Sequence, residues 1–345
     1  MSTASNMLAF GIAWELQIDT KGNNGVATEW IIGQDSWLPE SLRVTFQIEE
    51  LGYTEKWWGD ISIYNLSPST KDAIIMQGAN VTLSAGYQDG TSYGVIFKGK
   101  IFQWIWSRED VVDYKLTLHC LAGLDYEVDN MVSFQAQAGT SQRDIIMRMM
   151  EQAETPIPVE SIDSDTLGTI VLPRGEIVFG SPNSYLNKVA RSNGLQHYFG
   201  ETGVVIGDIT PTTNVSQYTY SSVPDPSNDN KRVAGVNYTI IGTPQQIQNG
   251  VEMRVLMDAR LRPKAPATNI KIDNTVIRQM LITPPDAASA QSPTLWPVLA
   301  QDGVYAVASV KHVGDTRGNE WYTDVVGITN QSGILNALGE ADSLH

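Results

Sequence analysis

The chain has 345 residues with 23 basic and 38 acidic side chains, and its formal net charge is −15 at pH 7. This length predicts two or three domains, and the negative charge argues against tight binding of nucleic acid. The single cysteine, Cys120, excludes an intramolecular disulfide and suits a reducing cytoplasm. No run approaches the ~20 apolar residues of a membrane span, and the N-terminus lacks the pattern of a signal peptide. We therefore expect a soluble protein without membrane insertion.

Residues 1–122 contain several runs with the two-residue period of half-buried strands. The runs cover residues 42–48, 81–87 and 114–120. Residues 101–106 are apolar at both sets of alternating positions, so we expect a strand covered on both faces. One helix is predicted with Ser67 as N-cap, Pro68 at its first position and Gly78 as its stop. This part predicts a closed or nearly closed antiparallel barrel with one helix.

Residues 123–207 differ in character from the first part of the chain. Apolar residues in 140–152 follow the three-and-four spacing of an amphipathic helix. A second helix is predicted from Ser181 to the stop at Gly194, and a hairpin follows. We expect a small α+β insert.

Residues 208–329 return to strand patterns after a polar loop. The expected strands are 236–241, 251–257, 270–272, 304–313 and 321–328. Residues 330–345 form a short, partly apolar tail. The predicted fold class is mainly β with an α+β insert: two tube-like antiparallel β-barrel domains flank a smaller helix-containing domain.

The chain offers few signs of reactive chemistry. Residues 94–100 have the spacing of a phosphate-binding loop, but Ile101 replaces the required Ser or Thr and the segment continues as a strand. None of the four histidines has metal-ligand spacing to another His or Cys. His119 alternates away from Cys120 and is expected on the sheet surface. We predict no catalytic residue, no metal and no cofactor, and therefore a protein that is not an enzyme.

The stretch HVGDTRGNEW, residues 312–321, combines a histidine with charged residues and glycines. It lies between two strand patterns and contains residues that tolerate positive φ, so we interpret it as a hairpin bend. Asp315 and Arg317 are expected to close this turn as a pair. A general acid or base needs a dry cleft that shifts its pKa, which a hairpin tip usually lacks. Recognition of a partner at the tip is the remaining alternative.

Residues 60–67, the capped helix, and residues 78–87 and 96–101 follow one another as strand, helix, strand and strand. This succession resembles the N-terminal domain of the tail baseplate hub proteins of bacteriophages. Residues 305–323 resemble their closing hairpin. The resemblance extends from about residue 37 to residue 328 and depends mainly on the order and spacing of strand and turn patterns.

The resemblance implies a particular architecture. Hub proteins of this kind form a trimeric ring at the distal end of the tail tube, and each chain carries two tube-like β barrels. Three chains thereby present six similar barrels to a hexameric tube, and the hub holds a trimeric spike that punctures the host envelope. The two predicted β domains agree with this arrangement, and cyclic symmetry supplies a closed ring.

The resemblance also implies a function and a set of partners. We expect a structural virion protein, the baseplate hub of a contractile-tail phage or of a tail-like bacteriocin, located in the virion tail baseplate after assembly in the host cytoplasm. The expected partners are two further copies of the chain, the tail tube protein, the central spike protein, and the baseplate wedge and tape-measure proteins. Phage DNA would pass through the ring during ejection without specific binding.

The acidic balance leads to a further expectation about the ring. Carboxylates on the channel wall would repel DNA phosphates within a Debye length of roughly 8 Å. We therefore expect the acidic excess to concentrate on that wall. The alternative is that the charge serves solubility alone.

The aromatic composition favours contact surfaces, because the chain has nine tryptophans and thirteen tyrosines against seven phenylalanines. The candidate interface residues are Trp57, Trp58, Trp104, Trp106, Asp315, Arg317 and Trp321. Core packing is an equally good interpretation of Trp104 and Trp106. The alternative function is a glycan-binding all-β tail module that contacts the host surface, and an enzyme ranks third.

Overall fold

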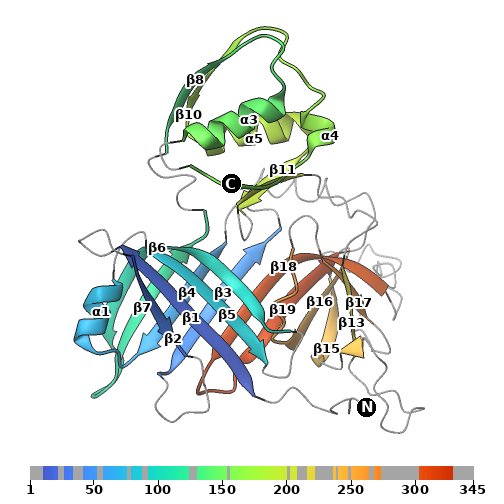
Figure 1. Ribbon diagram of the computed structural model, residues 1–345. Coiled ribbons are helices and arrows are strands. Elements are labelled where there is room, and N and C mark those ends of the chain that lie inside the picture. The colour runs from blue at the N-terminus through green and yellow to red at the C-terminus, as the bar shows by residue number, and fades with distance from the viewer. Residues whose placement is uncertain are drawn as a thin grey trace, which may run out of the picture.

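A computed structural model shows a mainly β protein with a small helical part (Figure 1), which confirms the predicted fold class. The predicted tail at 330–345 lies outside the residues that the structure describes, as does Gly78. The described residues are 11–21, 27–33, 42–52, 57–75, 79–87, 92–123, 130–153, 156–199, 203–207, 216–221, 236–237, 240–247, 250–263, 268–272 and 303–328.

The first β unit is formed by one helix and the strands that precede the insert. These elements are β1 (Ile12–Lys21), β2 (Ala27–Ile32), β3 (Val44–Leu51), β4 (Trp58–Tyr64), α1 (Pro68–Ile74), β5 (Asn80–Tyr87), β6 (Gly94–Arg108) and β7 (Tyr114–Leu121). The strands lie in the order β3-β4-β7-β6-β5-β1-β2, and each neighbouring pair is antiparallel.

The strands of the first β unit bury their inner faces in one shared cluster. Ile18 of β1, Ile48 of β3 and Leu118 of β7 all belong to it and are fully buried. Cys120 lies in the same cluster, as its alternating pattern predicts. A sheet whose strands all face one cluster has to curl around it, so this unit has a strongly curved, barrel-like sheet.

Helix α1 begins where the sequence predicts. The hydroxyl of Ser67 accepts a hydrogen bond from the backbone N–H of Thr70 at 3.1 Å, and Pro68 occupies the first turn. This is the arrangement that satisfies the unpaired donors at a helix start. Ile74 fixes the helix to the first β unit, because its side chain is buried in the same cluster as the strands.

The insert lies between the two β units in the sequence and has a buried core of its own. Its elements are β8 (Val132–Ala136), α3 (Gln142–Gln152), β9 (Val159–Ile162), α4 (Ser164–Leu167), β10 (Glu176–Gly180), α5 (Pro182–Asn193), β11 (Gln196–Phe199) and β12 (Val204–Gly207). The predicted helices are confirmed, and Gly194 ends α5 in the left-handed region with φ of 69°. In Figure 1 the insert stands above the two β units.

The second β unit follows the insert. Its strands are β13 (Gln217–Tyr220), β14 (Val236–Asn237), β15 (Ile240–Ile247), β16 (Gly250–Leu256), β17 (Asn269–Ile272), β18 (Gly303–Asp315) and β19 (Trp321–Ile328). Strand β13 pairs in parallel with β14 and β17, so this unit is not wholly antiparallel. A tight hairpin cannot join parallel neighbours, and residues 221–235 separate β13 from β14 along the chain.

Strand β18 belongs to both β units. Its first residues, from Gly303 to Ala306, pair with β17, whereas Ser309 to Asp315 pair with β3. Its other edge pairs with β19. All strands of both units therefore form one sheet of 14 strands (Figure 1).

Residues 101–106 differ from the sequence prediction, which expected a strand covered on both faces. Strand β6 pairs with β5 only as far as Lys100, and its remaining part extends beyond that neighbour. The side chains of Trp104 and Ile105 are 39% and 44% exposed. An apolar run at the end of a sheet is therefore partly open to solvent rather than buried.

Candidate assembly site between the two β units

The hairpin tip, residues 315–320, connects β18 to β19 and contacts the first β unit. The carboxylate of Asp315 accepts hydrogen bonds from Arg43 Nε at 3.1 Å and from Arg43 Nη2 at 2.7 Å. It also accepts one from the backbone N–H of Arg317 at 3.0 Å. Asp315 thus closes the turn through the Arg317 backbone, as a turn-forming aspartate does, while its ion pair is made with Arg43, which is 272 positions away in the sequence.

Two further hydrogen bonds hold the hairpin tip at the start of β3. The backbone N–H of Thr316 donates to the carbonyl of Val44, and the Val44 N–H donates to the Thr316 hydroxyl, both at 3.0 Å. Burial opposes ionisation of Asp315, but the hydrogen bonds from Arg43 and the tip backbone outweigh it and hold the pKa of Asp315 below its usual value. The hairpin tip is therefore held against the first β unit at Arg43 and Val44.

Trp321 begins β19 and joins it to two strands of the first β unit. Its ring meets the ring of Phe46 edge-on, with centroids 5.4 Å apart. Its indole N–H donates to the carbonyl of Gly86 at 3.1 Å, and the Tyr87 hydroxyl donates to the Trp321 carbonyl at 3.4 Å. These contacts bring the end of β5 against the start of β19, and they complete the wall around the first core.

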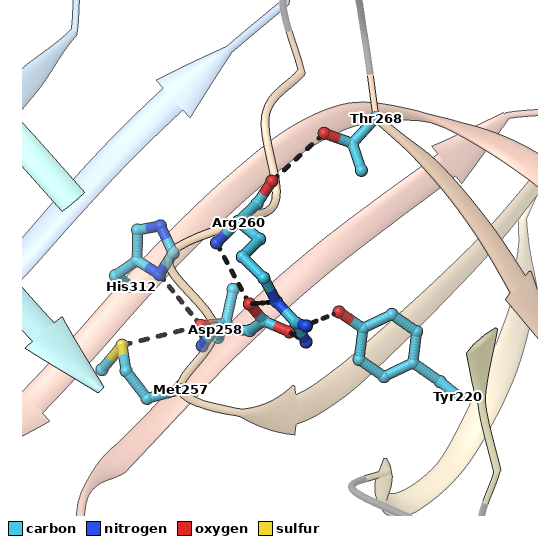
Figure 2. Close-up of polar contacts among 7 residues, drawn as sticks. Tyr220, Met257, Asp258, Arg260, Thr268 and His312 are labelled. Carbon is cyan, nitrogen blue, oxygen red and sulfur yellow. Dashed lines mark hydrogen bonds and ion pairs between the residues drawn. The ribbon is translucent and has the colours of Figure 1, made fainter. Parts of the chain in front are cut away.

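A buried carboxylate lies immediately after β16 (Figure 2). Asp258 accepts hydrogen bonds from Arg260 Nε at 2.8 Å and Arg260 Nη2 at 2.6 Å, and from the Tyr220 hydroxyl at 2.7 Å. Burial and the nearby Asp258 charge raise the pKa of Tyr220, so this hydroxyl stays protonated as a donor. Burial opposes the charge of Arg260, but its hydrogen bond to Asp258 outweighs that effect and raises the pKa of Arg260. The cluster fixes the bend that leads out of β16.

His312 lies behind this bend, where the Thr323 hydroxyl contacts it at 2.9 Å from Nδ1 (Figure 2). The same hydroxyl accepts a hydrogen bond from the backbone N–H of Asp258 at 3.2 Å and donates to the sulfur of Met257 at 3.7 Å. Burial, helped by the positive charge of Arg262, lowers the pKa of His312 to about 3. His312 is therefore a neutral, packed side chain near pH 7.

Arg262 reaches from the second β unit into the first. Its Nη2 donates to the carbonyl of Val95 at 2.6 Å, its Nη1 lies 3.9 Å from the carboxylate of Glu50, and its guanidinium lies 5.6 Å from the centre of the Trp57 ring. The backbone N–H of Ala259 also donates to the first unit, at Ser92. The segment after β16 therefore bonds across the junction with side-chain and backbone groups.

The insert also approaches this junction. Tyr198 of β11 is buried, and its pKa is raised by burial and then by the negative charges of Glu50 and Glu160. Glu50 is the residue of β3 that faces Arg262. Side chains from the insert and from both β units thus meet around Glu50.

The junction is held together by ion pairs and hydrogen bonds between the two β units and within the segment after β16. Its charged groups are paired with one another, and its histidine is neutral. In the described part of the chain, no group of three or more His, Cys, Asp or Glu side chains could hold a metal ion. Within the same residues, none of the helices is long and apolar enough to cross a membrane.

Three of the predicted interface residues make their contacts within the chain. Trp57 and Trp321 are 3% and 6% exposed and belong to the first core. Asp315 is buried against Arg43. These side chains hold the two β units together, which is a contact between parts of one chain.

The other predicted interface residues lie at or near the surface. Trp58 and Trp104 are 56% and 39% exposed, and Arg317 is exposed at the hairpin tip. Trp106 is half-buried and stacks on Tyr114 with ring centroids 5.5 Å apart. Trp58, Trp104 and Arg317 are thus placed where a partner could reach them.

The sequence analysis missed Asp258, Arg260 and Arg262. The sequence does contain a signal for these residues, because three charged side chains occupy alternate positions directly after the strand pattern at 251–257. Their partners are distant in the sequence: Tyr220 lies 38 positions from Asp258, and Val95 lies 167 positions from Arg262. Only the folded chain brings them together.

Comparison with solved structures reveals proteins of the same architecture. A tail protein from Neisseria meningitidis MC58 superposes with a TM-score of 0.53 at 12% sequence identity, over 94% of this chain and 98% of that one. The chain has the fold of phage tail proteins. The 43 kDa tail protein of prophage MuSo2 from Shewanella oneidensis gives a TM-score of 0.50 at 11% identity, over 92% of this chain and 99% of that one. No protein-family model matches the sequence, and no curated protein sequence matches it.

Proposed function

We propose that this chain is a structural component of a phage or phage-like tail, a baseplate hub that connects a hexameric tail tube to a trimeric central spike. Three copies form a closed ring, and the ring surrounds part of the path of the ejected DNA. The role is non-enzymatic. Wedge and tape-measure proteins are further partners, and assembly occurs in the host cytoplasm.

One observation supports this proposal above the others. The single sheet that passes through β18 holds two β units in a fixed relation within one chain. Three such chains around an axis present six β units, which matches the number of subunits in a hexameric ring. The fold of the tail protein from Neisseria meningitidis, which this chain shares over almost its whole length, supports the same role.

The domain boundaries belong to the same proposal. We assign residues 1–122 and 208–329 to two tube-like β domains and residues 123–207 to the insert. Separate buried clusters in the three parts support this division. Met257, Ala259 and Trp321 are exceptions, because they lie in the cluster of the first β unit.

Two measurements test the proposal. Light scattering should give a mass three times the 37.9 kDa of one chain, and the tagged chain should co-purify with the tube and spike proteins of the same tail. A monomer that binds neither protein contradicts the hub. The exposed rings of Trp58 and Trp104 favour a glycan-binding module as the second candidate, and saturable binding of cell-wall glycans by a monomer would support it instead.

A further inference from the structure

The sheet formed by β8 and β10 turns an apolar face to solvent. Ile177 and Phe179 of β10 are 74% and 76% exposed, and Met131, just before β8, is 53% exposed. Ser133 and Gln135 of β8 lie opposite Phe179 and Ile177 in the antiparallel register. We call these five residues the insert outer face. In Figure 1 the two strands form the outer side of the insert.

The insert outer face is distinct from the core of the insert. The alternate residues of the same strands, including Val178 and Phe134, are buried against α3 and α5 as part of the insert cluster. Successive side chains of a strand point to opposite faces. The exposed residues therefore contribute nothing to the packing of this insert, and large apolar side chains gathered on a surface mark contact sites.

The two strands also lack further strand partners. In the part of the chain that the structure describes, β8 and β10 pair only with each other. A two-stranded sheet is marginal by itself, and open strand edges offer backbone groups to another chain. The same surface thus combines apolar side chains with two strand edges, on one of which the Gln135 carbonyl accepts a hydrogen bond from Arg148 at 3.3 Å.

Charge indicates which partner fits this surface. The chain has a net charge of −15, so two copies repel each other across most pairs of surfaces. None of the five outward residues is charged, and the carboxylate of Glu176, at the start of β10, is paired with Lys188 at 2.8 Å. Two copies of the chain can approach here without unpaired like charges.

We propose that the insert outer face is a contact between neighbouring copies of this chain. The proposal rests on the ring of copies suggested above and adds the residues through which the copies meet. Ile177 and Phe179 supply the apolar area, and the edges of β8 and β10 supply the backbone groups. Because the two edges are different strands, the edge of β8 in one copy can meet the edge of β10 in the next, a head-to-tail contact that closes into a ring.

The first test compares two double variants by light scattering and sedimentation over a range of concentrations. Ile177→Thr with Phe179→Thr removes apolar area and keeps β-branched residues suited to a strand. We expect the dissociation constant for self-association to rise by about 100-fold or more, as for the loss of two interface anchors. The control, Val111→Thr with Val112→Thr, changes residues that are 73% and 76% exposed on the turn between β6 and β7 and should leave association unchanged.

The second test does not depend on stability. Cys120 is buried, and burial raises the pKa of its thiol, so it should not react. A mixture of Ser133→Cys copies and Ile177→Cys copies should therefore be cross-linked by a short bis-maleimide, because β8 of one copy meets β10 of the next, whereas each variant by itself should not be cross-linked. A Gln47→Cys variant, on the exposed face of β3, is the control and should remain uncross-linked.

The outcomes separate this inference from the hub proposal. The inference is overturned, while the hub stands, if the wild type is a trimer, the Ile177/Phe179 variant associates as tightly as the wild type, and positions 133 and 177 are not cross-linked between copies. A cross-link from position 133 to the spike protein, in place of one to a second copy, also overturns it, because the occupant is then the spike. The hub itself is judged by co-purification with the tube and spike.

Discussion

At the scale of single residues, Asp258 shows how much of the junction depends on one buried charge. It is 3% exposed and accepts hydrogen bonds from both Arg260 and Tyr220. Loss of one member of a buried pair leaves the other without compensation, which costs more than the pair contributes as a whole. This asymmetry makes Asp258 the most informative position in the junction.

Asp258→Asn should lower the free energy of unfolding by about 3 kcal/mol, because the charge of Arg260 loses its partner. The matched control is Asp324→Asn, which breaks the more exposed pair with Arg254 and should cost less than about 1 kcal/mol. Urea unfolding followed by tryptophan fluorescence measures both values. Equal costs for the two variants would show that the Asp258 pair is not buried in solution.

His312 predicts a dependence of stability on pH. Burial lowers its pKa from an ordinary value of 6.5 to about 3 in the folded chain. Between these values the unfolded chain binds the extra proton, so the free energy of unfolding decreases as the pH falls, by up to about 1.4 kcal/mol per pH unit from this group. His312→Gln should remove that part of the slope in urea unfolding between about pH 4 and pH 6. Identical slopes in both proteins would contradict the burial of His312.

At the scale of elements, the hairpin of β18 and β19 joins the two β units, and Trp321 is its main apolar anchor. The ring lies against Phe46 and donates to the carbonyl of Gly86. Trp321→Ala should cost about 3–5 kcal/mol, because it leaves a cavity and an unpaired buried carbonyl. Trp58→Ala, at a ring that is 56% exposed, should change the stability by no more than about 0.5 kcal/mol. Thermal unfolding of the two variants provides the comparison.

The elements that could be predicted from the sequence are those with local causes. Helix α1 follows from the capping by Ser67 and Pro68, and the hairpin of β18 and β19 follows from the two-residue period on each side of a glycine-containing turn. The bend after β16 could not be predicted, because the partners of Asp258 and Arg262 come from other elements. The exposure of Trp104 was missed for a related reason: no sequence pattern shows that β5 begins only at Asn80, opposite Lys100.

At the scale of the whole molecule, the shared strand β18 couples the stability of the two β units. Strand β18 forms backbone hydrogen bonds with β3 of the first unit and with β17 of the second. If either unit unfolds completely, β18 loses one of these two sets of bonds. Hydrogen exchange should therefore show β3 and β19 opening together with the same free energy, as one cooperative unit. Exchange in β19 at a much lower free energy than in β3 would show that the two units unfold separately.

The sharing of β18 also limits how this architecture can be divided. A polypeptide ending after residue 207 would include every strand from β1 to β7, yet β3 would lose the neighbour it has along Thr45 to Leu51. The first core would lose the indole that closes it, and a long bare strand edge would face solvent, where it promotes aggregation. We therefore expect the first half to need the second in the same chain, so that a transplant into another scaffold should carry both.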